Sequence, residues 1–333
     1  MKVLITGGAG FIGSTVGSAL IDHGHEVVVL DDFSTGREEF TEGRPTYRGD
    51  IADRAVVDRI FAEHPDIEAT LHCAAKIVVP ESVADPIGYY RNNVSGTLEL
   101  ADALLANGCT KLLFSSSASI YAVPEDFTVD EDSPLAPTSP YARTKAVVEA
   151  MLQDVARGTD LTVVSLRYFN PIGSDPKRRT GLQLKYPSHA LGKLIEARNA
   201  GEAFTVTGAD YPTRDGSGIR DYIHVWDLAD AHVRALENFP AALAGEDSAV
   251  INLGTGTGTT VFELVEAFNE VTGEKLETVV GPPRPGDQAG SYTRSSRAKE
   301  RLGWEAKHTI AEGIRDTLAW FDVRGEKLPD LAD

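Results

Sequence analysis

The sequence has only two cysteines, Cys73 and Cys109, and no apolar run of the length that a membrane-spanning helix needs. Two cysteines without a C-x-x-C partner cannot form a disulfide framework, and neither they nor the histidines show the spacing of metal ligands. The amino-terminal run Met1–Ile5 gives way to glycine, unlike the apolar core of a secretory signal. We therefore expect no metal, no membrane association and a cytoplasmic location.

Positive charge is also scarce. Lysine and arginine together number 32 against 50 aspartates and glutamates, which gives a formal net charge of -18 at pH 7. Binding of a nucleic acid needs clustered cations that displace counterions, and an acidic surface repels phosphate at long range. The basic cluster Lys177–Arg179 lies among polar residues and is typical of a solvated loop. The charge balance therefore argues against a nucleic-acid partner.

Short apolar runs alternate with helical patterns through the first half of the 333-residue chain. The apolar runs are Val3–Ile5, Val27–Leu30, Ala69–His72, Leu112–Phe114 and Leu161–Val164. Strands without polar alternation, each followed by a helix, favour a parallel sheet covered on both faces. We expect a Rossmann-type doubly wound α/β domain over residues 1–170, with a return segment near 221–237, and a smaller α/β domain over residues 171–333.

A glycine-rich loop, Gly7-Gly8-Ala9-Gly10-Phe11-Ile12-Gly13, follows the first apolar run. It fits G-x-x-G-x-x-G from Gly7 and G-x-G-x-x-G from Gly8, patterns that bring backbone amides at a helix amino terminus close to a pyrophosphate. Asp31 ends the next apolar run, where a carboxylate can bind the adenosine ribose and repel a ribose phosphate. The sequence therefore predicts a dinucleotide site that prefers NAD to NADP.

A second glycine run, Gly254–Thr260, also lies between an apolar segment and a helical pattern. No acidic ribose partner follows it at the end of a second strand, so a second dinucleotide site is poorly supported. We expect a structural loop with a threonine at the helix N-cap.

Tyr141 and Lys145 form a Tyr-x-x-x-Lys pair behind the serine run Ser115–Ser117. Pro140 and the apolar residues after Lys145 predict a helix, in which this spacing places phenol and ammonium on one face. A phenol with a pKa near ~10 needs roughly 4 kcal/mol of stabilisation to ionise at neutral pH, which one cation about 4 Å away supplies near a protein surface. The pair therefore predicts a tyrosine general base, and an oxidised nicotinamide ring nearby would favour it further.

Together these residues resemble the UDP-glucose 4-epimerase (UDP-galactose 4-epimerase) family of the extended short-chain dehydrogenase/reductase superfamily. The similarity spans nearly the whole chain. Beyond the glycine loop and the Tyr-Lys pair, it rests on Gly49–Ile51, Ala74–Lys76, Tyr90–Val94, Phe114–Ala118, Leu166–Pro171, Gly218–Val225 and Pro283–Asp287.

The resemblance implies a role for each matching residue. The expected catalytic residues are Tyr141 as the base, Lys145 as the cation that lowers the pKa of its phenol, and Ser117 as the hydrogen-bond partner of the sugar hydroxyl. The expected NAD-binding residues are Gly7, Gly10, Phe11, Ile12, Gly13, Asp31, Asp50, Ile51, Lys76, Asn93, Tyr141, Lys145 and Tyr168. The expected residues for a UDP-sugar substrate are Ser117, Tyr141, Asn170, Arg220, Arg284, Asp287 and Ser291. Two arginines suit two phosphates because the guanidinium fork matches phosphate oxygens.

The resemblance further implies a homodimeric isomerase that inverts C4 of a UDP-hexose with bound NAD, through a 4-keto intermediate and without net oxidation. Such a reaction needs firm binding of the nucleotide and loose binding of the hexose, which has to turn. Two alternatives stay open: another NAD-dependent UDP-sugar enzyme, such as a UDP-uronate decarboxylase, and a non-catalytic NAD-binding regulator. A dehydratase is disfavoured, because Ser117-Ala118-Ser119 lacks the acid pair that eliminates water.

Three positions depart from the family pattern. His189-Ala190-Leu191-Gly192 replaces the usual Asn-Leu-x-Pro or His-Leu-x-Pro, which leaves the uridine contact there open. Val78-Val79-Pro80 replaces a glycine-containing segment after Lys76. Ser291 stands at the family's size gate, and its small side chain predicts room for an N-acetyl group on the hexose.

Overall fold

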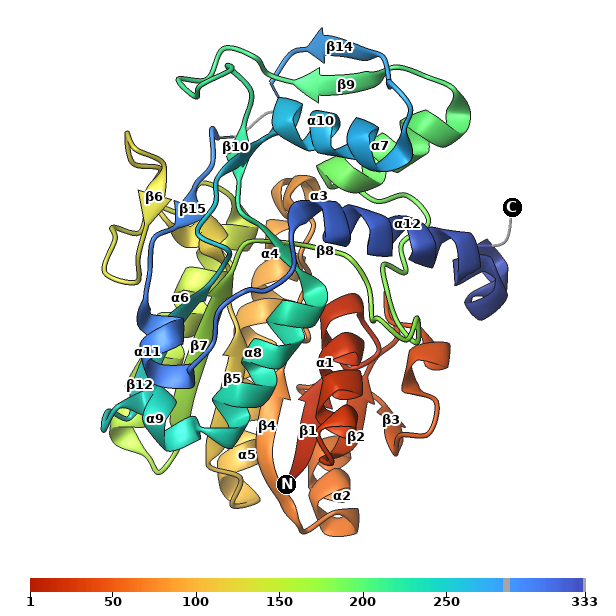
Figure 1. Cartoon of the computed structure of the whole chain (residues 1–333). Coiled ribbons are helices and arrows are strands. Elements are labelled where there is room, and N and C mark those ends of the chain that lie inside the picture. The colour runs from red at the N-terminus through yellow and green to blue at the C-terminus, as the bar shows by residue number, and fades with distance from the viewer. Residues whose placement is uncertain (284–287, 332–333) are drawn as a thin grey trace.

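The computed structural model describes residues 1–283 and 288–331 of the chain. Its centre is a seven-stranded parallel sheet in the order β12-β7-β5-β4-β1-β2-β3 (Figure 1). The strands are β1 (Lys2–Thr6), β2 (Glu26–Asp31), β3 (Thr46–Arg48), β4 (Ile67–His72), β5 (Lys111–Ser115), β7 (Thr162–Tyr168) and β12 (Ser248–Leu253). The predicted doubly wound α/β fold is confirmed, and the apolar runs predicted as strands lie in β1, β2, β4, β5 and β7.

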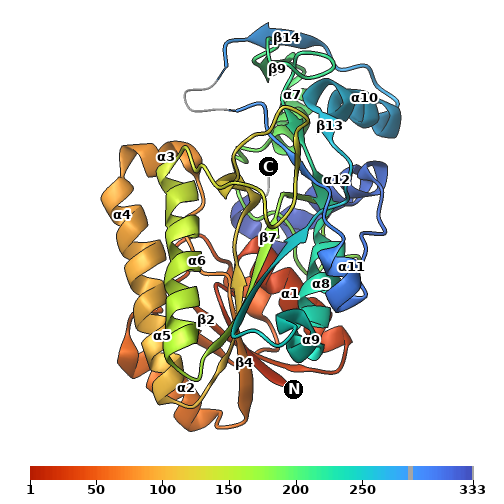
Figure 2. The same ribbon diagram turned by 90° about the vertical axis from the view of Figure 1, so that its left-hand side faces the viewer.

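Helices cover both faces of this sheet, as Figure 2 shows. One face carries α1 (Phe11–Asp22), α8 (Val225–Glu237), α9 (Phe239–Leu243) and α11 (Arg297–Leu302), and the other carries α2 (Arg54–Glu63), α5 (Gly96–Ala106) and α6 (Pro140–Gly158). In β1, Val3 and Ile5 pack into the first core and Leu4 into the second. Both faces of the strand are buried, which is why its sequence does not alternate.

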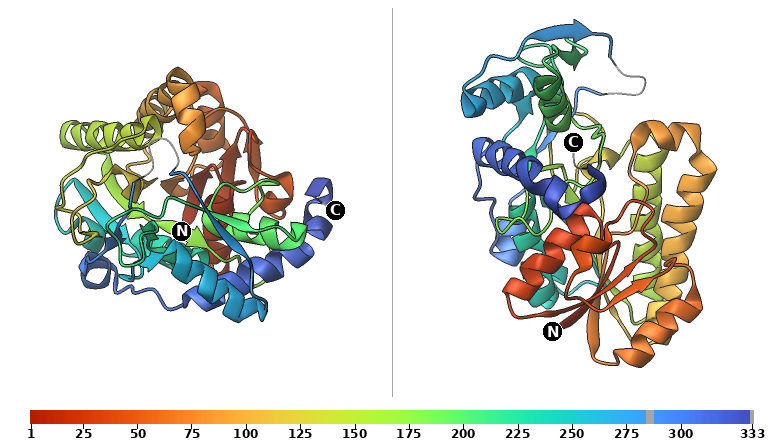
Figure 3. Two further views of the ribbon diagram at one scale, coloured as in Figure 1. Left: turned by 90° about the horizontal axis from the view of Figure 1, so that it is seen from above. Right: turned by 90° about the vertical axis from the view of Figure 1, so that its right-hand side faces the viewer.

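Three further helices and several short strand pairs form a second layer toward the carboxyl ends of the sheet strands (Figure 3). Its helices α7 (Ala190–Ala200), α10 (Val261–Thr272) and α12 (Ile310–Lys327) share a separate apolar core. Short strand pairs complete it: β6 (Thr128–Val129) with β15 (Tyr292–Thr293), β8 (Asn170–Ile172) with β11 (Tyr222–His224), β9 (Phe204–Thr207) with β14 (Thr278–Gly281), and β10 (Ile219–Arg220) with β13 (Thr259–Thr260).

The chain returns to the main sheet after it enters the second layer. Helix α8 packs beside α1, and β12 pairs with β7 at the edge of the sheet. The sequence did not predict β12. The division of the chain into domains over residues 1–170 and 171–333 stays a prediction.

Candidate active site

The glycine loop connects β1 to α1. Gly7 has a φ of 71°, in the left-handed region that favours glycine, and a Cβ there would lie 2.6 Å from the backbone nitrogen of Ala74. A Cβ at Gly13 would lie 2.3 Å from the carbonyl oxygen of Gly7. Gly10 is the N-cap of α1, and within the described residues no side chain caps it. The backbone amides from Phe11 to Gly13 are therefore open to an anion at the helix terminus.

Asp31 ends β2 beside this loop. Its Oδ2 accepts a hydrogen bond from the Ala9 amide at 2.9 Å, and its Oδ1 accepts one from the Phe33 amide at 2.8 Å. Burial raises the pKa of Asp31, and these two amide bonds oppose that shift. A Cβ at Gly36 would lie 2.8 Å from Oδ1, so the loop after β2 closes tightly around the carboxylate. The structure thus fixes an acid next to the glycine loop.

Helix α6 carries Tyr141 in its first turn and Lys145 one turn later. Its N-cap is Ser139, whose hydroxyl accepts a hydrogen bond from the Ala142 amide at 3.1 Å. Lys145 is buried, and its Nζ lies 2.7 Å from the carbonyl oxygen of Ser115 and 4.8 Å from the ring centroid of Phe114. The helix therefore places its ammonium at the carboxyl end of β5, where the serine run begins.

Burial has the largest effect on the pKa of both residues of this pair. Burial raises the pKa of Tyr141, and a hydrogen bond with the Ser117 side chain opposes that rise. Burial lowers the pKa of Lys145 to about 8, while the neighbouring Cys73 and Glu149 oppose the fall. The phenol thus stays protonated at neutral pH, and another positive charge beside it would favour its ionisation.

Asn93 joins the loop after β4 to α6. It lies in a π-helical turn, Arg91–Ser95, between α4 (Pro86–Tyr90) and α5. Its Oδ1 accepts a hydrogen bond from the Lys76 amide at 2.9 Å, and its Nδ2 donates to the Lys76 carbonyl and to Thr144 Oγ1, both at 3.0 Å. The amide of Asn93 therefore holds Lys76 in place. Thr144 was not predicted, although its position between Tyr141 and Lys145 was an available signal.

Three further predicted cofactor residues lie at strand ends. Tyr168 ends β7 next to Ser115 and Tyr141, and burial raises the pKa of its phenol well above the usual value. Ile51 is buried in the core beneath α2 and α5. Asp50 is exposed in the loop after β3, where its Oδ1 accepts a hydrogen bond from the Ala52 amide at 2.9 Å.

The predicted substrate residues lie in the second layer. Asn170 begins β8, and its backbone N–H donates a hydrogen bond to the backbone carbonyl of Asp221 at 3.0 Å. Arg220 donates from Nη1 to the Ala289 carbonyl at 2.6 Å and from Nη2 to the Gln288 carbonyl at 3.2 Å. Ser291, half-buried, follows this segment and precedes β15. Arg284 and Asp287 lie outside the described residues.

The Asp221 carboxylate holds the second glycine run, Gly254–Thr260, in place through hydrogen bonds. It is fully buried and accepts hydrogen bonds from the Thr255 amide at 2.8 Å and the Gly256 amide at 3.1 Å. Thr260 caps α10, and Glu263 completes a capping box. The predicted threonine N-cap is confirmed.

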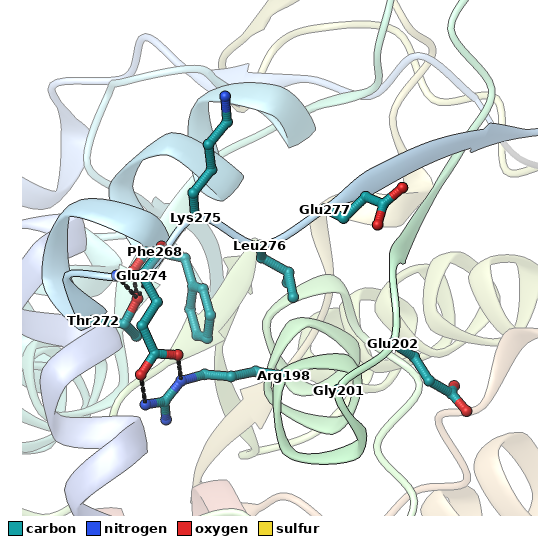
Figure 4. A pocket seen from close by; sticks show the side chains of 9 residues that line it. All are labelled: Arg198, Gly201, Glu202, Phe268, Thr272, Glu274, Lys275, Leu276 and Glu277. Atoms are coloured by element: carbon teal, nitrogen blue, oxygen red, sulfur yellow. Dashed lines mark hydrogen bonds and ion pairs between the residues drawn. The ribbon is translucent and has the colours of Figure 1, made fainter.

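A pocket of about 250 Å³ lies apart from these residues, at the carboxyl ends of α7 and α10 (Figure 4). Arg198 spans it, donating two hydrogen bonds of 2.9 Å to Glu274. The other lining residues are Gly201, Glu202, Phe268, Thr272, Lys275, Leu276 and Glu277. None of them is a predicted site residue.

No cluster of three or more His, Cys, Asp or Glu side chains among the described residues is arranged to hold a metal ion. None of the helices in the described part of the chain has the length and apolarity to cross a membrane.

Comparison with known proteins gives consistent matches. The NAD dependent epimerase/dehydratase family matches residues 3–254. A UDP-glucose 4-epimerase of Bacillus subtilis (strain 168) is 42% identical, over 98% of this chain and 99% of its own. The structure of a UDP-glucose 4-epimerase from Stenotrophomonas maltophila, with bound NAD and formylated UDP-arabinopyranose, superposes with a TM-score of 0.91 at 39% identity, covering 98% of this chain and 99% of that one. A UDP-glucose 4-epimerase from Bifidobacterium longum, in complex with NAD+ and UDP, gives a TM-score of 0.90 at 35% identity over 100% of both chains.

Proposed function

This chain belongs to the UDP-glucose 4-epimerase family, within the NAD dependent epimerase/dehydratase family, and we propose that its site inverts C4 of a UDP-hexose with bound NAD. The enzyme is an isomerase, because the substrate undergoes no net oxidation. The observation that carries the proposal is the convergence of Tyr141, Lys145 and Ser117 at the carboxyl end of β5.

The residues around the glycine loop fit NAD. Gly7 and Gly13 leave a cradle that a Cβ would fill, and Asp31 stands beside it with both carboxylate oxygens oriented by backbone amides. Gly10, Phe11 and Ile12 would contact the pyrophosphate, and Asp50, Ile51, Lys76, Asn93 and Tyr168 would line the rest of the cleft. NAD bound there would supply the hydride acceptor, and then the hydride donor, for C4 of the sugar.

Side chains of this protein transfer the proton of the sugar 4-hydroxyl. Tyr141 takes the proton of the sugar 4-hydroxyl, and Ser117 shares a hydrogen bond with that hydroxyl and the phenol. Lys145 stabilises the phenolate as its charge develops, from a buried position. The same three groups return the proton when the hydride comes back.

Residues of the second layer would bind the nucleotide part of the substrate. We assign Asn170, Arg220, Arg284 and Asp287 to the diphosphate and its ribose. Arginine suits this role, because its planar fork matches phosphate oxygens. Strong contacts to the nucleotide and few to the hexose would let the sugar turn between the two hydride transfers.

One experiment tests the function. The purified protein is denatured, the released cofactor is identified, and a panel of UDP-hexoses is assayed by product separation. The expected result is NAD, and conversion of UDP-galactose to UDP-glucose without added reductant. A UDP-uronate decarboxylase would instead release CO2 from UDP-glucuronate, and a regulator would bind NAD without turnover.

We further propose that Ser291 leaves room for an N-acetyl group, so that UDP-N-acetylhexosamines are also substrates. A bulky S291Y variant should lose this activity and keep that on UDP-glucose. The idea fails if the unmodified enzyme epimerises UDP-glucose but neither binds nor epimerises UDP-N-acetylglucosamine.

We also propose a cytoplasmic homodimer. Two free cysteines suit a reducing compartment, and exposed apolar side chains on α4, α5 and α6 support a second copy as the partner: Ile87 is 68% exposed, Leu98 45% and Val147 41%. Light scattering should give twice the chain mass, and an I87E/L98E variant should give the monomer mass. A monomer in the unmodified protein would refute the dimer.

A further inference from the structure

A buried ion pair lies one helical turn beyond Lys145 on the same side of α6. Glu149, one turn after Lys145, accepts hydrogen bonds from Arg167 of β7: Nη2 donates to Oε2 at 2.6 Å, and Nε lies 3.0 Å from Oε1. The two side chains are 3% and 5% exposed. Neither residue was predicted as a site residue. The pair joins the helix of the proposed base to β7 of the central sheet.

The ion pair is the centre of a larger polar cluster. The Ser116 hydroxyl donates to Glu149 Oε1, so the carboxylate also binds the serine run between Ser115 and Ser117. Arg167 Nη1 donates to Tyr121 Oη at 2.8 Å, and that hydroxyl donates to Asn252 Oδ1 of β12 at 2.7 Å. Side chains of α6, β7 and β12 and of the loop after β5 therefore meet in one hydrogen-bonded unit.

Stability alone is a weak reason for such a cluster. Removing two charges from water is costly, and a well-packed apolar pair of similar volume is often as stable or more so. What an apolar pair cannot do is orient the Ser116 hydroxyl or place a negative charge one helical turn from Lys145.

We propose that Glu149 is a positioning residue for the reaction: its carboxylate holds the Tyr141–Lys145 helix against the serine run and provides an anion one helical turn from Lys145. This inference rests on the proposed epimerase function. It adds a residue that touches neither substrate nor cofactor and acts through Lys145.

The surroundings of Lys145 identify Glu149 as its anion. From β4, burial holds the pKa of His72 down to about 3 and that of the Cys73 thiol up to about 11, so both are neutral near pH 7. Tyr168 of β7 and Tyr141 of α6 are neutral as well, because burial raises the pKa of both phenols. Cys73 and Glu149 both raise the pKa of Lys145, and of these two residues Glu149 is the one that stands in a buried ion pair, with Arg167.

The test compares kcat/KM for the UDP-hexose across pH, together with the melting temperature, in four holoenzymes: unmodified, E149Q, E149M/R167M and D175N. Asp175 is a matched control, because it is a buried carboxylate with its own arginine partner, Arg179, and belongs to no part of the proposed site. E149Q should move the alkaline limb of the kcat/KM profile, which reports loss of the Lys145 proton, to lower pH by about one unit. The reason is that the negative charge four residues along the helix, which favours the Lys145 ammonium, is then gone.

The double variant separates positioning from folding. E149Q leaves Arg167 buried without its carboxylate and should melt at a lower temperature than the unmodified enzyme. E149M/R167M should recover much of that melting temperature. Its alkaline limb should still lie at a lower pH than that of the unmodified enzyme. D175N should melt earlier with an unmoved alkaline limb. An unmoved limb in E149Q, or a fully restored profile in E149M/R167M, would overturn the inference. Absence of turnover in the unmodified enzyme would instead refute the proposed function.

Discussion

Lys145 Nζ donates a hydrogen bond of 2.7 Å to the backbone carbonyl of Ser115, two residues before Ser117. This bond anchors the only ammonium of the proposed catalytic trio to the strand end that carries the serine hydroxyl. It uses one of the three donors of the ammonium and leaves others for a ligand in the cleft.

Replacing Lys145 should therefore abolish most of the activity. We expect K145M to lower kcat by about a hundredfold or more, because the phenolate loses the cation that stabilises it. K145R keeps the charge but should also be strongly impaired, since the 4% exposed site has little room for a planar guanidinium. Steady-state kinetics on the two variants check this. A K145M enzyme with more than about a tenth of the original kcat would contradict the assigned role.

Asp31 should set the preference between the two dinucleotides. D31N removes the charge that binds the ribose hydroxyls and repels a ribose phosphate, so we expect about tenfold weaker NAD binding and a relative gain for NADP. The neighbouring D32N is the control, because Asp32 is exposed and its Oδ1 accepts a hydrogen bond from the Ser34 amide. Titration of apo protein with each cofactor measures both effects. Equal changes in D31N and D32N would argue against a specific role for Asp31.

Gly13 should tolerate no side chain. A Cβ would lie 2.3 Å from the Gly7 carbonyl oxygen, so we expect G13A to distort the loop and to purify with little or no NAD. The control is G158A, at the end of α6, where a Cβ meets nothing within 4 Å. That variant should keep its cofactor and gain a little stability, since alanine is the better helix former. Full cofactor content in G13A would contradict the proposed cradle.

Most of the fold and the core of the site could be predicted from the sequence, because their signals are local. The glycine loop, Asp31 and the Tyr141–Lys145 spacing each lie within one strand-turn-helix unit or one helical turn. The sheet could be predicted because buried parallel strands are apolar without alternation.

Long-range relationships could not be predicted in the same way. Strand β12 pairs with β7 about eighty residues away, and its apolar run carries no signal for that partner. Glu149 forms its ion pair with Arg167 on β7, and no local pattern in the sequence predicts that partner. Arg220 donates hydrogen bonds to the carbonyls of Gln288 and Ala289, and Asp221 accepts hydrogen bonds from the loop at Thr255 and Gly256, contacts that no local sequence pattern predicts.

Buried neutral histidines should make the protein sensitive to acid. His72 is 1% exposed between Thr6 Oγ1 and Thr97 Oγ1, and burial lowers its pKa from 6.5 to about 3. Between these values the unfolded chain binds the extra proton, so the stability that His72 contributes is present above about pH 6.5 and is lost as pH falls. The loss is about 2 kcal/mol at about pH 5.

Urea unfolding at two pH values checks this. The free energy of unfolding is measured at about pH 7.5 and at about pH 5, and the loss between the two is compared in H72Q and the unmodified protein. The loss should be about 2 kcal/mol smaller in H72Q, because glutamine takes up no proton. Identical losses in the two proteins would show that His72 is not held neutral in the fold.

The most direct measurement is the rate of interconversion of UDP-galactose and UDP-glucose by the Y141F variant with its NAD content verified. Phenylalanine keeps the ring and removes the group that takes the proton, so we predict a kcat lower by about a hundredfold to ten-thousandfold with NAD still bound. A Y141F enzyme that isomerises the sugars at the original rate would contradict the assignment of Tyr141 as the base, and with it the proposed mechanism.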